Sequence, residues 1–256
     1  MKRVLTALAL VPVVLYAVVW GDYYVFLVVL SAAAMLCWRE YSRIVGWYGF
    51  GGVGPPGYAA GLAILVVPRL DAVSITLLVL LAFALAIRTD DPGKMLPLAA
   101  LLVFGLLWVF GAWRAAIGVR NIHPYWLLFA LTINWVGDTA AYYAGRAIGN
   151  HKLAPRLSPA KSWEGAAASV LVTLAYAWGF FRWLLPQTPL AYGLVVAAVG
   201  NVAGQFGDLC ESAVKRGAGV KDSGTMLPGH GGWLDLLDSS LFTMPAVYFL
   251  LLRPWS

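Results

Sequence analysis

VLTALALVPVVLYAVVW, residues 4–20, is an apolar run without a single charged residue. It follows Met1-Lys2-Arg3, as the apolar region of a signal peptide would, but it ends without a convincing small-residue cleavage site. A second apolar run begins directly after Gly21 and Asp22. We therefore expect residues 4–20 to be retained as the first helix of a membrane protein.

The whole chain repeats this pattern. It has 256 residues, a mean hydropathy of +0.77 and only 12% charged residues, whereas soluble domains carry about 25%. A membrane-crossing helix needs roughly 20 apolar residues. The candidate spans are 4–20, 23–39, 56–68, 72–88, 96–118, 124–145, 164–185, 190–210 and 239–252. The sequence predicts an all-α polytopic membrane protein with about nine transmembrane helices.

The basic residues predict an orientation for these spans. With the N-terminus in the cytoplasm, 13 of the 18 Lys and Arg residues fall on the cytoplasmic side and 5 fall outside. Cytoplasmic loops of membrane proteins carry such an excess. We expect a cytoplasmic N-terminus, an external C-terminus and an inner (plasma) membrane location. The net charge of +6 then reflects this orientation and anionic lipid headgroups, and indicates no nucleic-acid partner.

Polar residues are concentrated in the second half. We expect residues 1–120 to form a scaffold of transmembrane helices and residues 121–256 to form the functional region. The latter contains two long loops predicted to be cytoplasmic, 146–163 and 211–238. A monomer and a homodimer are both consistent with the sequence.

Four aspartates lie in or beside the spans of the second half: Asp138, Asp208, Asp235 and Asp238. Carboxylates at such depth are costly and mark functional sites. If residues 205–216 are helical, then Asp208, Glu211, Ser212 and Lys215 share one face. Hard carboxylate oxygens close to phosphate-binding bases suit Mg²⁺. An internal network of ion pairs would explain the same residues without a metal.

The segment after Asp208 has features of an anion site. Lys215, Arg216 and Lys221 can neutralise phosphate. Gly231 and Gly232, which follow His230, allow backbone N–H groups to approach an anion. A simple turn before the last helix would also explain these glycines.

A second group lies in the sequence RLSPAKSWEG, residues 156–165. Ser162 is expected to be a helix N-cap, and Ser-Pro before it favours a turn. Free N–H groups at a helix N-terminus attract anions, and Lys161 would strengthen such a site. An N-cap beside a solvated lysine is the simpler interpretation.

The stretch from Ser212 to Asp238 resembles the signature of phosphatidate cytidylyltransferases, also called CDP-diacylglycerol synthases. The matching positions, all in register, are Ser212, Lys215, Arg216, Lys221, Asp222, Gly224, Leu227, Pro228, His230, Gly231, Gly232, Asp235 and Asp238. SPAKSWEG (158–165) and DTAAYYAGRAIG (138–149) also resemble segments of this family.

The resemblance implies transfer of CMP from CTP to the lipid phosphate of phosphatidic acid, which yields CDP-diacylglycerol and pyrophosphate in phospholipid biosynthesis. It implies a catalytic Mg²⁺, alone or with a second cation, held by Asp208 and Asp235. The implied catalytic residues are Asp208, Asp235, Lys215 and Asp222. The implied substrate-binding and orienting residues are Ser158, Lys161, Ser162, Ser212, Arg216, Lys221, His230, Gly231, Gly232, Asp138, Glu164 and Asp238.

One position departs from the family pattern. The family has Arg between the last two aspartates, where this chain has Leu236. The loss of a cation there puts the level of activity or the lipid preference in doubt. The alternatives are an isoprenoid-lipid cytidylyltransferase, a CTP-dependent lipid kinase, an inactive relative, or a transporter that uses the intramembrane aspartates as an ion path.

Overall fold

The structure is a computed structural model that describes residues 2–67, 70–229 and 231–253. Almost all of these residues are helical. The helices are α1 (Lys2–Leu15, continued by η1, Tyr16–Trp20), α2 (Tyr23–Trp47), α3 (Gly54–Val66), α4 (Ala72–Ala86), the unbroken series η2 (Pro92–Lys94), α5 (Met95–Gly105), η3 (Leu106–Gly111) and α6 (Ala112–Ile122), then α7 (Pro124–Ile148), α8 (Trp163–Trp183), α9 (Leu190–Gly217) and α10 (Trp233–Leu251). They form nine continuous segments within the described ranges, close to the predicted spans.

The helix lengths identify a multi-pass membrane protein. Five segments are long and apolar enough to cross a membrane: α2, the η2–α6 series, α8, α9 and α10. The apolar part of α1–η1, α3 and α4 are shorter; α3, with 13 residues, is only about 20 Å long at 1.5 Å per residue. Helix α7 has 25 residues but includes polar Asn134 and Asp138.

Three helices extend well beyond the predicted spans. Helix α2 continues past residue 39 to Trp47, α9 continues past residue 210 to Gly217, and α10 begins at Trp233 instead of residue 239. Residues 218–232 therefore connect α9 and α10. The polar segment between α7 and α8 forms a small antiparallel hairpin of β1 (Lys152–Ala154) and β2 (Ser158–Ser162), which the sequence analysis did not predict. The turn predicted at Ser158-Pro159 lies at residues 155–157, because Ser158 already pairs with Ala154 in the hairpin.

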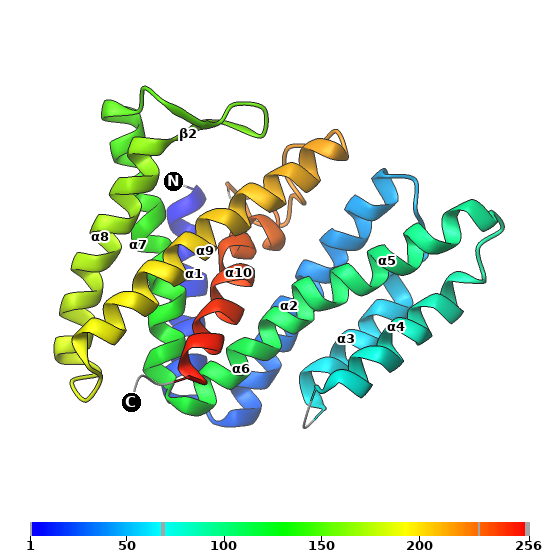
Figure 1. Ribbon diagram of the computed structural model, residues 1–256, viewed down its shortest axis with the longest axis horizontal. Coiled ribbons are helices and arrows are strands. Elements are labelled where there is room, and N and C mark those ends of the chain that lie inside the picture. Colours follow the sequence, from blue (N-terminus) through cyan, green and yellow to red (C-terminus); the bar gives the residue numbers. More distant parts are fainter. Residues whose placement is uncertain (1, 68–69, 230, 254–256) are drawn as a thin grey trace.

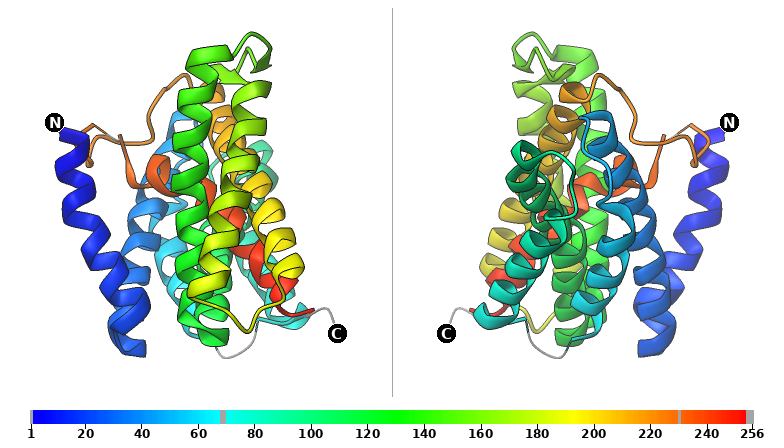
Figure 2. Two further views of the ribbon diagram at one scale, coloured as in Figure 1. Left: turned by 90° about the vertical axis from the view of Figure 1, so that its left-hand side faces the viewer. Right: turned by 90° about the vertical axis from the view of Figure 1, so that its right-hand side faces the viewer.

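The later helices form a bundle at one side of the molecule. Helix α7 packs against α8, α8 against α9 and α9 against α10 (Figure 1), while α4 and α5 pair at the opposite side. Figure 2 shows α1 at the edge of the molecule. The hairpin, the start of α1 and the 218–232 segment lie at one end of the bundle, and α10 finishes at the other end.

Polar contacts and small residues join the helices of this bundle below the hairpin. Asn201 of α9 donates from Nδ2 to Ser169 Oγ (3.0 Å) and to Thr173 Oγ1 (3.1 Å), both on α8. A Cβ at Gly137 of α7 would collide with Asn201 and Ser169. Close backbone approach with interhelical hydrogen bonds is typical of membrane helix packing. This packing fixes α7 and α9, which carry Asp138 and Asp208.

An aromatic cluster holds the earlier helices. Trp38 and Tyr41 of α2 are fully buried and lie 5.3 Å apart between ring centroids. Phe110 of η3 lies 5.7 Å from Trp38. Because these rings anchor α2 in the core, Glu40, which lies between Trp38 and Tyr41 in the sequence, is held in a fixed position.

Candidate active site

A pocket of about 630 Å³ gathers the aspartates of the second half. Its walls come from α7, α9, α10 and the 218–232 segment. Six residues predicted for the site line it: Asp138, Asp208, Lys215, Asp222, Asp235 and Asp238. Leu236, which departs from the family pattern, also lies in the wall, beside aromatic residues of α7 such as Trp135 and Tyr142. The lining of the pocket is thus acidic at its aspartates and apolar around Trp135 and Leu236.

Asp208 lies opposite the strand that precedes α8. Its Oδ2 is 2.5 Å from Lys161 Nζ, and both side chains are partly exposed. Ser212, one turn along α9, donates from Oγ to Asp208 Oδ1 over 3.5 Å. The predicted shared face of α9 is therefore confirmed, and β2 brings a lysine to it.

Lys215 bridges two carboxylates. Its Nζ forms an ion pair with Glu211, one turn earlier on α9, and lies 2.5 Å from Asp235 Oδ1 of α10. Glu211 is completely buried, and Lys215 is only 8% exposed. A buried carboxylate needs such a partner to offset the cost of removing its charge from water. This triad fixes the register between α9 and α10 at the pocket.

Asp235 is held by backbone donors as well. Its carboxylate accepts hydrogen bonds from Gly232 N (2.7 Å) and Ser223 N (2.9 Å). Gly232 is the N-cap of α10 and Asp235 is its third residue, so the Asp235 carboxylate makes the half of a capping box that a glycine N-cap allows. The Asp235 N–H donates to Ser223 Oγ at 3.3 Å. Gly231 takes a φ of +80°, which a glycine adopts without strain. This geometry is the turn before the last helix that was the alternative explanation for these glycines, and their approach to an anion stays a prediction.

Asp138 and Asp238 complete the acidic wall. Asp238 uses Oδ1 to accept from Ser239 N at 2.5 Å, and among the described residues none donates a hydrogen bond to the Asp138 side chain. The charges of Asp138 and Asp208 both act on Asp238. Hard carboxylate oxygens around one cavity fit a divalent cation. In the described ranges no three His, Cys, Asp or Glu side chains converge as a ready-made metal cluster.

The other predicted residues lie around this centre. Ser162 caps α8 by accepting from Gly165 N at 3.1 Å, which confirms the predicted cap. Ser158 begins β2. Glu164, in the first turn of α8, pairs at 2.6 Å with His151, which precedes β1, and Glu164 does not line the pocket. Arg216 donates to Leu157 O (3.4 Å) and Val220 O (3.0 Å), so it joins the hairpin to the 218–232 segment. Lys221 is exposed, and His230 lies outside the described residues.

Three residues near the centre were not predicted for the site: Glu40, Ser223 and Glu211. Glu40 lies on α2, yet its Oε2 accepts from Ser223 Oγ at 2.7 Å. In sequence it follows an apolar run and resembles a charged residue at a span end. Glu211 was noticed only as part of a helical face. Its spacing of four residues from Lys215 gave no sign that Glu211 would be fully buried.

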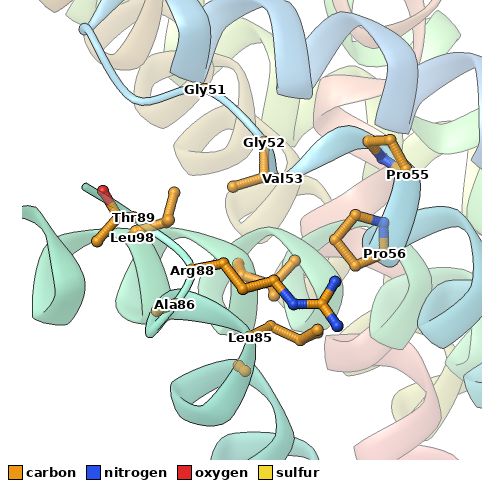
Figure 3. A pocket seen from close by; sticks show the side chains of 12 residues that line it. Gly51, Gly52, Val53, Pro55, Pro56, Leu85, Ala86, Arg88, Thr89 and Leu98 are labelled. Carbon is orange, nitrogen blue, oxygen red and sulfur yellow. The ribbon is translucent and has the colours of Figure 1, made fainter.

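A second pocket, of about 510 Å³, lies between the α2–α3 connection, α4 and α5 (Figure 3). Glycine, proline and leucine dominate its lining, and Arg88 is the one charged residue among the described residues that line it. It offers no carboxylate to a cation and no second base to a triphosphate. The aspartate pocket is therefore the candidate for the chemistry.

Comparisons with known proteins identify the family of this chain. The model of the cytidylyltransferase family matches residues 1–253. A phosphatidate cytidylyltransferase of Haemophilus influenzae is 30% identical, over 95% of this chain and 96% of the relative. The enzymes of that name from Brucella suis (32% identical, 96% of this chain, 91% of the relative) and Bacillus subtilis (36%, 72% and 69%) are also similar. With residues 1–253 matched by the family model and relatives about 30% identical over nearly the full chain, this chain belongs to the cytidylyltransferase family.

Proposed function

We propose that this protein transfers CMP from CTP to phosphatidic acid and that the aspartate pocket is the reaction site. The observation that supports this most directly is the pairing of each central aspartate with a lysine, Asp208 with Lys161 and Asp235 with Lys215. When no substrate is bound, these pairs neutralise the charge of the site. When a polyanion enters, the lysines can bind it and the aspartates can bind a cation. In this proposal residues 121–256 carry the reacting groups and residues 1–120 support them.

The bases have distinct roles in the proposal. Lys215 lines the pocket and Lys161 contacts the pocket residue Asp208, and both bind phosphate oxygens of CTP. Lys221 and Arg216, which are exposed, attract the triphosphate and the lipid headgroup from solution. Ser212 and Asp222 orient these groups, together with the N-cap at Ser162. Fixed positive charges that meet the charge developing during transfer are the main source of catalysis in such sites.

A divalent cation fits the acidic wall, and Asp208 and Asp235 are the residues that would hold it. The ammonium groups of Lys161 and Lys215 lie 2.5 Å from these carboxylates, so positive charge is already stabilised at both positions. When bound, Mg²⁺ would neutralise phosphate charge near the bond that breaks. Asp138 and Asp238 add negative charge on the same wall, which would strengthen the site for one or two cations.

The reaction needs little proton transfer. An oxygen of the lipid phosphate attacks the α-phosphorus of CTP, a P–O bond forms, and the bond to the β-phosphate oxygen breaks to release pyrophosphate. The lipid phosphate is ionised near neutral pH, so the pocket supplies position and charge instead of a strong base. The apolar part of the lining around Trp135 and Leu236 would accept the glycerol side of the lipid.

Incubation of the purified protein with phosphatidic acid and CTP labelled at the α-phosphate is expected to move label into the lipid. Removal of divalent cations with EDTA should reduce the rate by more than about 100-fold, and Mg²⁺ should restore it, because fixed charge at the reacting phosphate contributes at least that much. Lipid extraction followed by counting measures the product.

The same assay separates the rivals. Transfer to an isoprenoid phosphate but not to phosphatidic acid would identify a different acceptor. Label that reaches the lipid only from the γ-phosphate would identify a kinase. Folded protein that labels neither lipid would contradict the proposal and favour an inactive relative or a transporter. Normal turnover would establish that Leu236 is tolerated.

The proposal also places the pocket on the cytoplasmic side, where CTP is present. Single cysteines at Arg156, in the hairpin turn, and Gln187, between α8 and α9, test this, since both residues are exposed and belong to opposite connections of α8. In a variant without Cys37 and Cys210, a membrane-impermeant thiol reagent applied to intact cells should label Gln187→Cys and not Arg156→Cys. The reverse pattern would exclude this orientation.

A further inference from the structure

Glu40 is a buried acidic residue on α2, in the half of the chain expected to serve as scaffold. Its side chain is 1% exposed, and burial of a carboxylate is costly unless hydrogen-bond donors compensate for the lost water. The donors come from the far end of the sequence. Glu40 Oε2 accepts from Ser223 Oγ at 2.7 Å and from Leu234 N at 2.8 Å.

The position of this carboxylate suits the start of α10. Leu234 is the second residue of that helix, and its N–H is one of the first-turn donors that lack a partner within the helix. A negative charge at a helix N-terminus is favourable. Glu40 Oε1 lies against Gly224 and, among the described residues, has no hydrogen-bond donor. Both hydrogen bonds to the Glu40 carboxylate are therefore accepted by one oxygen, Oε2.

Ser223 connects Glu40 to Asp235. Its Oγ lies 2.7 Å from Glu40 Oε2 and 2.9 Å from Asp235 Oδ2, and its N–H donates to Asp235. One hydroxyl proton serves two carboxylates, so the position of Ser223 determines how Asp235 is held. Ser223 is fully buried, and water cannot replace its hydroxyl readily.

Other contacts bind the same segment to the first two helices. Arg39 Nη1 lies 3.3 Å from Met226 Sδ, and Thr6 Oγ1 donates to Pro228 O at 3.2 Å. Tyr48, at the end of α2, donates to Val214 O of α9 at 2.8 Å. The 218–232 segment and the end of α9 therefore contact α1 and α2 at several points. Among these described contacts, that of Glu40 leads through Ser223 to the pocket residue Asp235.

We propose that Glu40 is a positioning residue for cytidylyl transfer: through Ser223 it fixes the Asp235 carboxylate and the first turn of α10 against the pocket. This inference rests on the proposed role of Asp235 in the reaction. Glu40 itself does not line the pocket and acts only through its neighbours. The catalytic centre is accordingly shared between the two halves of the chain.

Glu40→Gln is expected to lower kcat by about 10- to 100-fold, because small displacements of a reacting group have effects of that order. The KM for CTP should stay within about twofold, since the phosphate-binding lysines remain. Ser223→Ala should give a similar loss. The kcat of the double variant should be about equal to that of the single variants, because both changes break the same connection. Asp22→Asn, an acid-to-amide change at the N-cap of the same helix, should leave kcat unchanged.

Hydrogen exchange of the backbone provides a readout that does not depend on turnover. The Ser223 and Gly232 amides bond to Asp235, not to Glu40, and they should exchange at least about tenfold faster in Glu40→Gln than in the parent protein, as local openings become more frequent. Unchanged exchange at these two amides would overturn the inference. The inference would also be overturned if the losses in kcat of Glu40→Gln and Ser223→Ala added up in the double variant, or if either single variant kept the parental kcat.

The outcomes distinguish this inference from the proposed function. If the parent protein does not transfer CMP, the proposed substrates fail, whereas the exchange measurement still tests the Glu40–Ser223–Asp235 connection. If Glu40→Gln does not fold, Ser223→Ala removes a single oxygen from the same connection and decides the result. A loss of activity that only follows a loss of thermal stability, with exchange raised across the whole protein, would assign Glu40 a general structural role and overturn the inference.

Discussion

Asp208→Asn is expected to reduce kcat by about 10³-fold while the protein remains folded. Asparagine has the same shape but no charge, so it loses the attraction for Lys161 at 2.5 Å and for a divalent cation. Asp208 is partly exposed and is not a helix-packing residue, so the free energy of unfolding should change little. CDP-diacylglycerol formation and thermal unfolding in detergent measure the two quantities.

A matched acid-to-amide control is available outside the pocket. Asp71 caps α4 by accepting from Ser74 N at 2.8 Å, and Asn is an equally good N-cap. Asp71→Asn should therefore retain full activity. If Asp208→Asn also turned over at the parental rate, Asp208 would have no part in the mechanism, and the cation would have to be held by Asp138, Asp235 or Asp238.

Local patterns predicted the parts of the structure that depend on near neighbours. Ser162 was identifiable as an N-cap because a cap needs only its own side chain and the next turn. The face of α9 that carries Asp208 and Lys215 followed from the period of a helix. The nine helical segments were visible because each contains a continuous apolar run of the sequence.

Contacts between distant segments were not predictable in this way. Glu40 and Ser223 are separated by 183 positions, and no periodicity relates them. The β1–β2 hairpin is short and polar, so its pairing depends on α7 and α8 beside it more than on its own sequence. Helix α9 continues past the predicted span because Lys215 pairs with both Glu211 and Asp235. These ion pairs satisfy charged residues that hydropathy alone would assign to a loop.

Lys215→Met is expected to have the largest effect on stability. It leaves Glu211, which is fully buried, and Asp235 without their cation. Removal of one partner from a buried ion pair lowers the free energy of unfolding by about 3–5 kcal/mol. Transfer activity should fall with it, because Lys215 also faces the pocket. Thermal unfolding in detergent measures the first effect. Lys221→Met, at an exposed lysine, should change stability by less than about 0.5 kcal/mol.

The double variant Lys215→Met/Glu211→Gln separates the two roles of Lys215. Glutamine removes the unpaired buried charge, so a substantial part of the lost stability should return, because a neutral buried pair is less costly than a single buried ion. Activity should not return, because the Lys215 ammonium group is still missing from both Asp235 and the substrate phosphate. Recovery of both properties would mean that Lys215 only neutralises Glu211. A single variant as stable as the parent would mean that the buried triad contributes nothing to the fold.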